Sequence, residues 1–175
     1  MEDDEILALK KACNSFEEEV IVNLLLDTGM RVSELTNLSE EQINWQRGFI
    51  TTIGKGKKRR IIPFSSSSRF YLSNYFKHKA KFDLSPRLVQ MRVKAVAERA
   101  RIRKPVSPHV LRHTFAVCYL HKGGNVRALQ AILGHSSLTT TDIYLNYSGI
   151  RVIDDYNRIW EQNEDNRNAR LNQFF

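Results

Sequence analysis

The pattern of hydrophobic and polar positions in this 175-residue chain predicts helices over most of its length. A first helix is expected over residues 3–13 and a second over residues 16–27. Ser15 and Glu18 have the spacing of a capping box that begins the second helix, and Gly29 is placed to end it. Because the apolar residues of this second helix follow one another almost without interruption, we expect it to be buried nearly all round.

Two short segments have the composition of strands instead. Residues 49–53 and 59–63 are rich in β-branched side chains, and the sequence Gly-Lys-Gly-Lys-Lys at 54–58 separates them. The pattern predicts a β-hairpin with a cationic, glycine-rich tip. The tip lacks the Gly-Lys-Ser/Thr ending of a nucleotide-binding loop. Two interpretations stay open, a charged surface turn and a finger that enters DNA.

Helical patterns resume after the hairpin. We expect the aromatic side chains near Phe70 to pack in the core rather than to stack on bases, and Met91 to lie on a buried helix face. Serine followed by proline marks two of the helix starts. The predicted helices cover 68–79, a stretch that begins at Pro86, Pro108 to about Lys122, Asn125 to Leu133, a helix with Tyr144 near its first turn, and residues 150–160.

These elements predict one α+β domain over residues 1–162, mainly α-helical, with a small antiparallel β-hairpin or sheet. Residues 163–175 are polar and are expected to form a mobile tail. With 42% hydrophobic and 26% charged residues, the composition is that of a globular protein, and no apolar run is as long as a membrane span. The acidic N-terminus is unlike a targeting peptide, and two cysteines are too few for a disulfide framework. We therefore expect a cytoplasmic protein with no membrane partner.

Charge is distributed unevenly along the chain. The net charge is +8, whereas residues 1–27 contain eight acids and two lysines and therefore sum to −6. The remaining residues consequently carry +14. The high positive charge of residues 28–175 favours a polyanionic partner, most simply nucleic acid, although a soluble basic protein of another kind would share this composition.

The candidate chemistry lies mainly in the last third of the chain. His109 and Arg112 are three residues apart on one predicted helix and therefore share a face. His135 follows a helix-ending glycine, and Tyr144 comes nine residues later. Arginine can hold a phosphate, histidine can move a proton and tyrosine can act as a nucleophile, while no metal-ligand spacing is present. Taken singly, each residue has an ordinary structural alternative, such as a surface ion pair for Arg31.

Five motifs then occur in a fixed order. They are Gly-Met-Arg-Val-Ser-Glu-Leu at 29–35, Gly-Lys-Gly-Lys at 54–57, His-Val-Leu-Arg-His at 109–113, Leu-Gly-His at 133–135, and the tyrosine at 144. In this combination they resemble the catalytic domain of the tyrosine site-specific recombinases, most closely the Xer-type recombinases and the integrases of phages and transposons. The likeness extends from about residue 2 to residue 147. It implies the catalytic fold of that family, in agreement with the pattern of elements.

The resemblance implies site-specific DNA recombination or integration by metal-independent cleavage and religation through a 3′-phosphotyrosyl intermediate, with no cofactor. Tyr144 would be the nucleophile, with His109 accepting its proton and Lys55 acting as general acid; Lys57 is the rival of Lys55 for that last role. Glu34 matches a residue that orients the loop. The implied catalytic set is Arg31, Lys55, His109, Arg112, His135 and Tyr144, and the basic residues expected to contact the DNA backbone are Lys57, Lys58, Arg59 and Arg60.

The resemblance also implies partners. Double-stranded DNA would be the substrate, with four protomers assembling on two DNA sites and a monomer in the absence of DNA. Residues 150–160 are the candidate for a helix that docks on a neighbouring protomer, with packing on their own domain as the alternative. In this family a separate helical DNA-binding domain commonly precedes the catalytic one. Since this sequence starts at the catalytic domain, we expect a fragment of a longer, nucleoid-associated protein, with an unusually short natural protein as the alternative. Two other functions stay open, a type IB topoisomerase and a catalytically inactive DNA-binding accessory protein.

Overall fold

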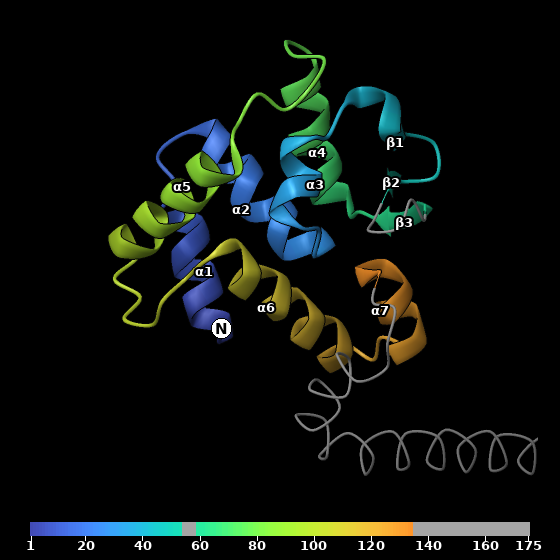
Figure 1. Cartoon of the computed structure of the whole chain (residues 1–175). Coiled ribbons are helices and arrows are strands. Elements are labelled where there is room, and N and C mark those ends of the chain that lie inside the picture. The colour runs from blue at the N-terminus through green and yellow to red at the C-terminus, as the bar shows by residue number, and fades with distance from the viewer. Residues whose placement is uncertain (54–58, 135–175) are drawn as a thin grey trace, which may run out of the picture. The chain divides into compact units, whose positions relative to one another are not determined.

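The computed structural model describes residues 1–53 and 59–134, which are mainly helical (Figure 1). The helices are α1 (Asp3–Lys11), α2 (Phe16–Thr28), α3 (Val32–Thr36), α4 (Ser66–Phe76), α5 (Pro86–Arg99), α6 (Pro108–His121) and α7 (Val126–Leu133). A short 3-10 turn, η1 (Glu40–Gln42), leads into the strands β1 (Ile43–Asn44), β2 (Phe49–Ile53) and β3 (Arg59–Pro63). The prediction of a mainly helical α+β fold with a small antiparallel sheet is confirmed.

Local capping explains where the helices begin. At the start of four helices, a serine hydroxyl accepts a hydrogen bond from the backbone N–H three residues later, which satisfies a group that lacks a partner within the helix. Proline occupies the first turn of α5 and α6, where its missing N–H costs nothing. The capping serines are Ser15, Ser65, Ser85 and Ser107. The predicted starts at Phe16, Pro86 and Pro108 are confirmed, whereas α4 starts at Ser66 rather than at residue 68.

Helix α2 is the centre of the core. Its residues Ile21, Leu24 and Leu25 are fully buried, and the helix packs against α1, α4, α5 and α6. Burying a side chain of this size contributes about 1.5–3 kcal/mol relative to exposure. The prediction that this helix is buried nearly all round is confirmed. The turn after α2 is consequently held in a fixed place beside α6.

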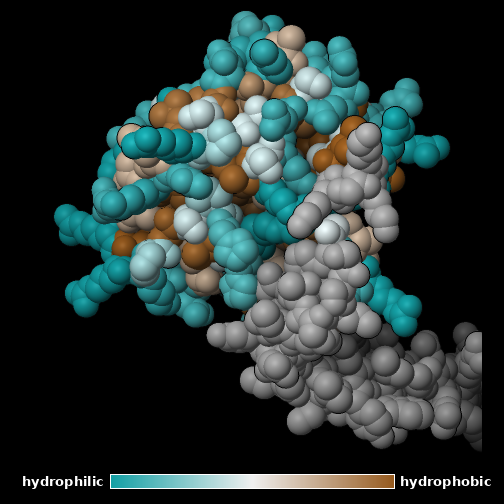
Figure 2. All heavy atoms as spheres, in the orientation of Figure 1, coloured by the Kyte–Doolittle hydropathy of each residue, from teal (hydrophilic) through white to brown (hydrophobic). Residues whose placement is uncertain are grey.

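Some apolar side chains reach the surface, where hydrophobic residues lie between hydrophilic ones (Figure 2). Two of the core expectations are wrong in this respect. Phe70 and Met91 are each 59% exposed, because their faces of α4 and α5 have no element packed over them among the described residues. Tyr75 and Phe76, later on α4, are buried as expected. No helix in the described part of the chain has both the length and the apolar character needed to cross a bilayer.

The sheet has the order β1-β2-β3 and is antiparallel throughout. Its strand β1 has only two residues and was not predicted from the sequence. In the β2–β3 register, Ile50 pairs with Ile62 and Thr52 pairs with Arg60, and all four residues are buried. Helix α7 packs against β3. The alternation of the strand therefore directs the side chain of Arg60 to the same buried face as Ile62. Figure 1 shows α7 beside β3.

Candidate active site

The turn between α2 and α3 begins the site. Gly29 ends α2 with φ +59°, a conformation that favours glycine. A Cβ at this position would lie 2.2 Å from a ring atom of Phe115 on α6, so the absence of a side chain also lets the turn approach α6 closely. Two residues later, Arg31 has an extended backbone and precedes α3. Sequence and packing thus place Arg31 next to helix α6, which carries the His-x-x-Arg motif.

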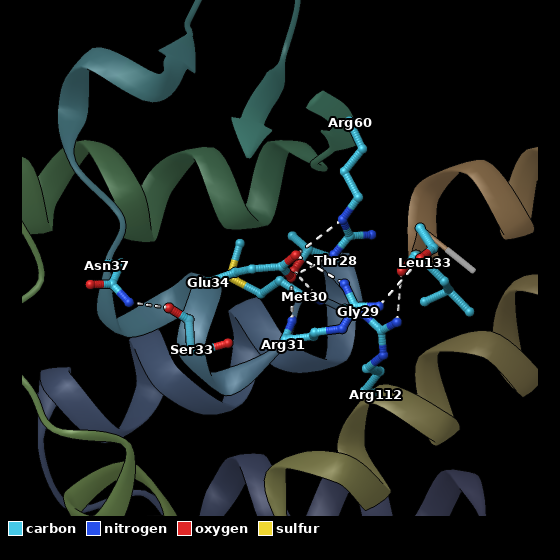
Figure 3. Close-up of polar contacts among 11 residues, drawn as sticks. Thr28, Gly29, Met30, Arg31, Ser33, Glu34, Asn37, Arg60, Arg112 and Leu133 are labelled. Carbon is cyan, nitrogen blue, oxygen red and sulfur yellow. Dashed lines mark hydrogen bonds and ion pairs between the residues drawn. The ribbon is translucent and has the colours of Figure 1, made fainter. Parts of the chain in front are cut away.

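Arg112 is buried, with 7% of its surface exposed, and it connects two helix ends. Its Nη1 donates to the carbonyl oxygen of Gly29, and its Nη2 donates to the carbonyl oxygen of Leu133 at 2.8 Å. Carbonyl groups at a helix C-terminus lack donors within the helix and carry the negative end of its dipole. The guanidinium therefore holds the end of α2 and the end of α7 together (Figure 3).

Arg31 reaches the same end of α7. Its Nη2 donates to the carbonyl oxygen of Gly134 at 3.3 Å, the residue directly after the Leu133 carbonyl that Arg112 binds. About 37% of the Arg31 side chain is exposed, in contrast to Arg112. The two predicted phosphate-binding arginines come from α6 and from the start of α3, and they converge on consecutive carbonyls (Figure 3).

A single carboxylate, that of Glu34, serves two arginines. Its Oε1 accepts from Arg31 Nη1 at 3.2 Å and from Arg60 Nε at 3.1 Å. Its Oε2 accepts from the backbone N–H of Arg31 at 2.6 Å and from Arg60 Nη2. Burial alone would raise the pKa of the Glu34 carboxyl, but the hydrogen bonds from Arg60 and Arg31 and their charges lower that pKa overall. Glu34 is thus ionised and orients the loop, the role expected for it.

The expectation for Arg60 needs correction. A contact of Arg60 with the DNA backbone is expected from the sequence, whereas in the structure its side chain is only 7% exposed and is bound by Glu34. Sequence reasoning missed the Arg60–Glu34 pair although a signal was present, because Arg60 lies two residues before the buried Ile62 and so faces the same side of the strand. Arg59, in contrast, is exposed.

The two histidines of the His-Val-Leu-Arg-His motif on α6 have different surroundings. His109 is exposed on the first turn of the helix, one turn before Arg112. His113 is partly buried, and its burial, the positive N-terminal amino group and His109 together lower its pKa. A neutral His113 fits a supporting, structural role better than a phosphate-binding one.

The charge of the cluster is positive. Arg31, Arg60 and Arg112 contribute three positive charges, and Glu34 contributes one negative charge. Such a cluster, partly removed from water, can hold a phosphate dianion or a phosphodiester. In residues 1–53 and 59–134, no group of three His, Cys, Asp or Glu side chains is placed to hold a metal ion. The remaining predicted site residues lie outside the described residues; they are Lys55, Lys57, Lys58, His135 and Tyr144.

Comparison with known proteins gives an independent view of the chain. The model of the phage integrase family matches residues 1–149. Among curated proteins, the chain is 34% identical over 177 residues to "Tyrosine recombinase XerD" of Staphylococcus aureus, an alignment that covers 89% of this chain and 60% of the relative. The chain thus spans about 60% of the length of that relative.

Solved structures share the fold. The XerA recombinase structure superimposes with a TM-score of 0.78 at 30% sequence identity, covering 90% of this chain and 62% of that one. The catalytic domain of bacteriophage HP1 integrase superimposes with a TM-score of 0.69 at 28% identity, covering 90% of this chain and 94% of that domain. The matched part of this chain therefore corresponds to nearly the whole of the HP1 integrase catalytic domain.

Proposed function

The chain belongs to the phage integrase family, and we therefore propose that it catalyses site-specific recombination of double-stranded DNA through a 3′-phosphotyrosyl intermediate. The observation that supports this most directly is the convergence of Arg31 and Arg112 on consecutive carbonyls at the end of α7. Two guanidiniums fixed side by side provide paired donors for the two non-bridging oxygens of a phosphodiester. His135, which follows Gly134 in the sequence, would supply a third donor.

The proposed cleavage step is an in-line displacement at phosphorus. The hydroxyl oxygen of Tyr144 attacks the scissile phosphate and forms a phosphate ester with the 3′ end, while the bond to the 5′ oxygen breaks. An unperturbed tyrosine has a pKa of about 10, so its proton must be accepted during the attack; His109, exposed at the start of α6, is the proposed acceptor. Lys55 would give a proton to the departing 5′ oxygen. Arg31 and Arg112 stabilise the charge that grows on the non-bridging oxygens.

Recombination follows because the covalent link conserves the phosphodiester. The 5′-hydroxyl of a partner strand attacks the phosphotyrosine and displaces the tyrosine, so neither a nucleotide cofactor nor a metal ion is required by the proposal. We further propose that four protomers assemble on two DNA sites and that residues 150–160 dock on a neighbour, with a monomer in the absence of DNA. These residues lie outside the described part of the chain. Cytoplasmic, nucleoid-bound DNA would be the natural substrate.

Covalent capture from a randomised library tests this function and selects the target sequence in the same experiment. The chain is incubated, in the presence of EDTA, with a duplex library that has a fixed nick and randomised flanks, so that the short 5′-hydroxyl fragment diffuses away after cleavage. We expect an adduct that resists denaturation, joined to a 3′ phosphate and enriched in a limited set of sequences. Absence of any adduct, or attachment to a 5′ end, would contradict the proposal. Relaxation of plasmids that lack the enriched sequence would indicate a topoisomerase instead.

The role of Lys55 can be separated from DNA binding by changing the leaving group. We expect Lys55→Ala to lower the rate of adduct formation by about 10² with an ordinary substrate, at the lower end of the range for a general acid. A substrate with a 5′-bridging sulfur should restore the rate, because a thiolate departs without protonation. The measurement is the single-turnover rate with each substrate.

Lys57→Ala is the matched control for that experiment, since it removes an equal charge from the same hairpin tip. Its rate should respond little to the bridging sulfur. If sulfur rescues Lys57→Ala rather than Lys55→Ala, the acid is Lys57.

A further inference from the structure

Arg60 reaches the site from strand β3 of the sheet. It lies on β3 with its side chain buried, and its guanidinium forms a fork of two hydrogen bonds with Glu34, from Nε to Oε1 and from Nη2 to Oε2. Its Nη1 is buried as well and has no hydrogen-bond partner among the described residues. A buried donor without a partner lowers the stability of the fold, so keeping this side chain in place costs some free energy of folding.

Glu34 lies between Arg60 and Arg31 and forms hydrogen bonds with both. Each oxygen of the carboxylate that Arg60 holds also accepts a hydrogen bond from Arg31, one from its side chain and one from its backbone N–H. A forked pair fixes both the place and the plane of a carboxylate, which a single point charge cannot do. The orientation of Arg31 therefore depends on the strand that carries Arg60.

Arg60 also contacts Gly134, whose carbonyl oxygen is the second acceptor for the Arg31 side chain. The side-chain stem of Arg60 lies against Gly134, where an added Cβ would be 2.7 Å from Arg60 Cδ. The carbonyl oxygen of the same Gly134 accepts a hydrogen bond from Arg31. Arg60 consequently touches both groups that hold the Arg31 side chain, the Glu34 carboxylate and the end of α7 (Figure 3 shows Arg60, Glu34 and Arg31 together).

We infer that Arg60 is a positioning residue for the proposed reaction, acting through Glu34 and Gly134 to hold the Arg31 guanidinium against the scissile phosphate. The inference rests on the proposed function. Two of the Arg60 nitrogens bind Glu34 and nearly all of its side chain is buried, whereas Arg59 is exposed, so the contacts that Arg60 makes among the described residues are with the groups that hold Arg31. Its effect on the rate is expected to pass through Arg31.

A double-mutant cycle tests the dependence on Arg31. Arg60→Met should lower the single-turnover rate of adduct formation by about 10², the size expected for a catalytic group displaced by about 1 Å. Arg31→Ala should lower it by roughly 10²–10³, and the double variant should be no slower than Arg31→Ala alone. Binding of the uncleaved duplex should change little in Arg60→Met. Losses that multiply in the double variant would overturn the inference.

Two further variants separate positioning from charge and from folding. Arg60→Lys keeps the charge beside Glu34 but lacks the fork, so it should be nearly as slow as Arg60→Met; full activity of this variant would overturn the inference. Arg47→Met removes an exposed arginine from the loop between β1 and β2 and should keep the wild-type rate. All rates are compared at a temperature at which thermal denaturation shows each variant to be folded, and Arg60→Lys carries the test if Arg60→Met does not fold.

A neutral substrate gives a readout that a folding defect would not move. When a methyl group replaces one non-bridging oxygen of the scissile phosphate, less charge has to be stabilised, and the deficits of Arg31→Ala and Arg60→Met should shrink in parallel. A deficit of Arg60→Met that stays constant would overturn the inference while leaving the proposed function intact. If the wild-type chain forms no adduct with any duplex, the proposed function fails and this inference fails with it.

Discussion

Replacement of Tyr144 with phenylalanine is expected to abolish the covalent adduct with DNA, with a rate loss on the order of 10⁴ or more. The change removes one oxygen atom, and in the proposed reaction that oxygen forms the bond to phosphorus. Without it, no covalent intermediate stores the phosphodiester, so both cleavage and strand exchange should stop. The measurement is the yield of denaturation-resistant adduct with nicked duplexes carrying the captured sequence.

Binding to uncleaved DNA is the control for that variant, because a single hydroxyl contributes little to an interface dominated by phosphate contacts. Tyr144→Phe should therefore bind the duplex with nearly the wild-type affinity and the same salt dependence. Tyr147→Phe is the matched variant, three residues away in the sequence, and should still form adduct. An adduct that persists in Tyr144→Phe but disappears in Tyr147→Phe would move the nucleophile to Tyr147.

Local signals in the sequence were enough to locate most elements. The bounds of β2 and β3 follow from their β-branched residues and the glycine-rich segment between them, and the structure has both strands as predicted. Helices that start with serine and proline were also predicted correctly, since capping is a local interaction. Strand β1 was missed because two residues carry no periodicity, and its pairing with β2 is a tertiary contact.

The candidate site was predicted only through motif order. Nothing in the local sequence states that Arg31 and Arg112 meet at the end of α7; that meeting depends on how α2, α6 and α7 pack. The family resemblance indicated that the two arginines act together, and the structure shows which carbonyl group each arginine binds at the end of α7. Arg60 shows the opposite case, because charge alone suggested a DNA contact while the alternation of β3 already indicated an inward side chain.

Exposure was the least predictable property. Phe70 and Met91 are apolar and fit a helical stripe, yet both are largely exposed because no described element covers their faces. Arg112 is charged, yet it is buried because helix-end carbonyls replace its water. Residue type sets the cost of burial, while the neighbours decide whether that cost is offset.

Arg112→Met is expected to lower both stability and activity. The variant loses the hydrogen bonds to Gly29 and Leu133, which leaves two helix-end carbonyls without their donors in a buried place. We expect the free energy of unfolding to fall by about 2–4 kcal/mol. The rate of adduct formation should fall by about 10³, because a donor to the scissile phosphate is lost and the α7 end that anchors Arg31 is released.

Two variants show which part of that loss is specific to Arg112. Arg127→Met removes an exposed arginine from α7 and should leave the melting temperature and the rate close to those of the wild-type chain. Arg112→Lys keeps the charge, but one ammonium group cannot reach carbonyls on two helix ends in the manner of a planar fork, so it should recover little of either property. An Arg112→Met chain that unfolds at the wild-type temperature would show that the bridge between α2 and α7 is not needed for the fold. If Arg112→Lys cleaves DNA at the wild-type rate, charge rather than geometry is what the scissile phosphate requires.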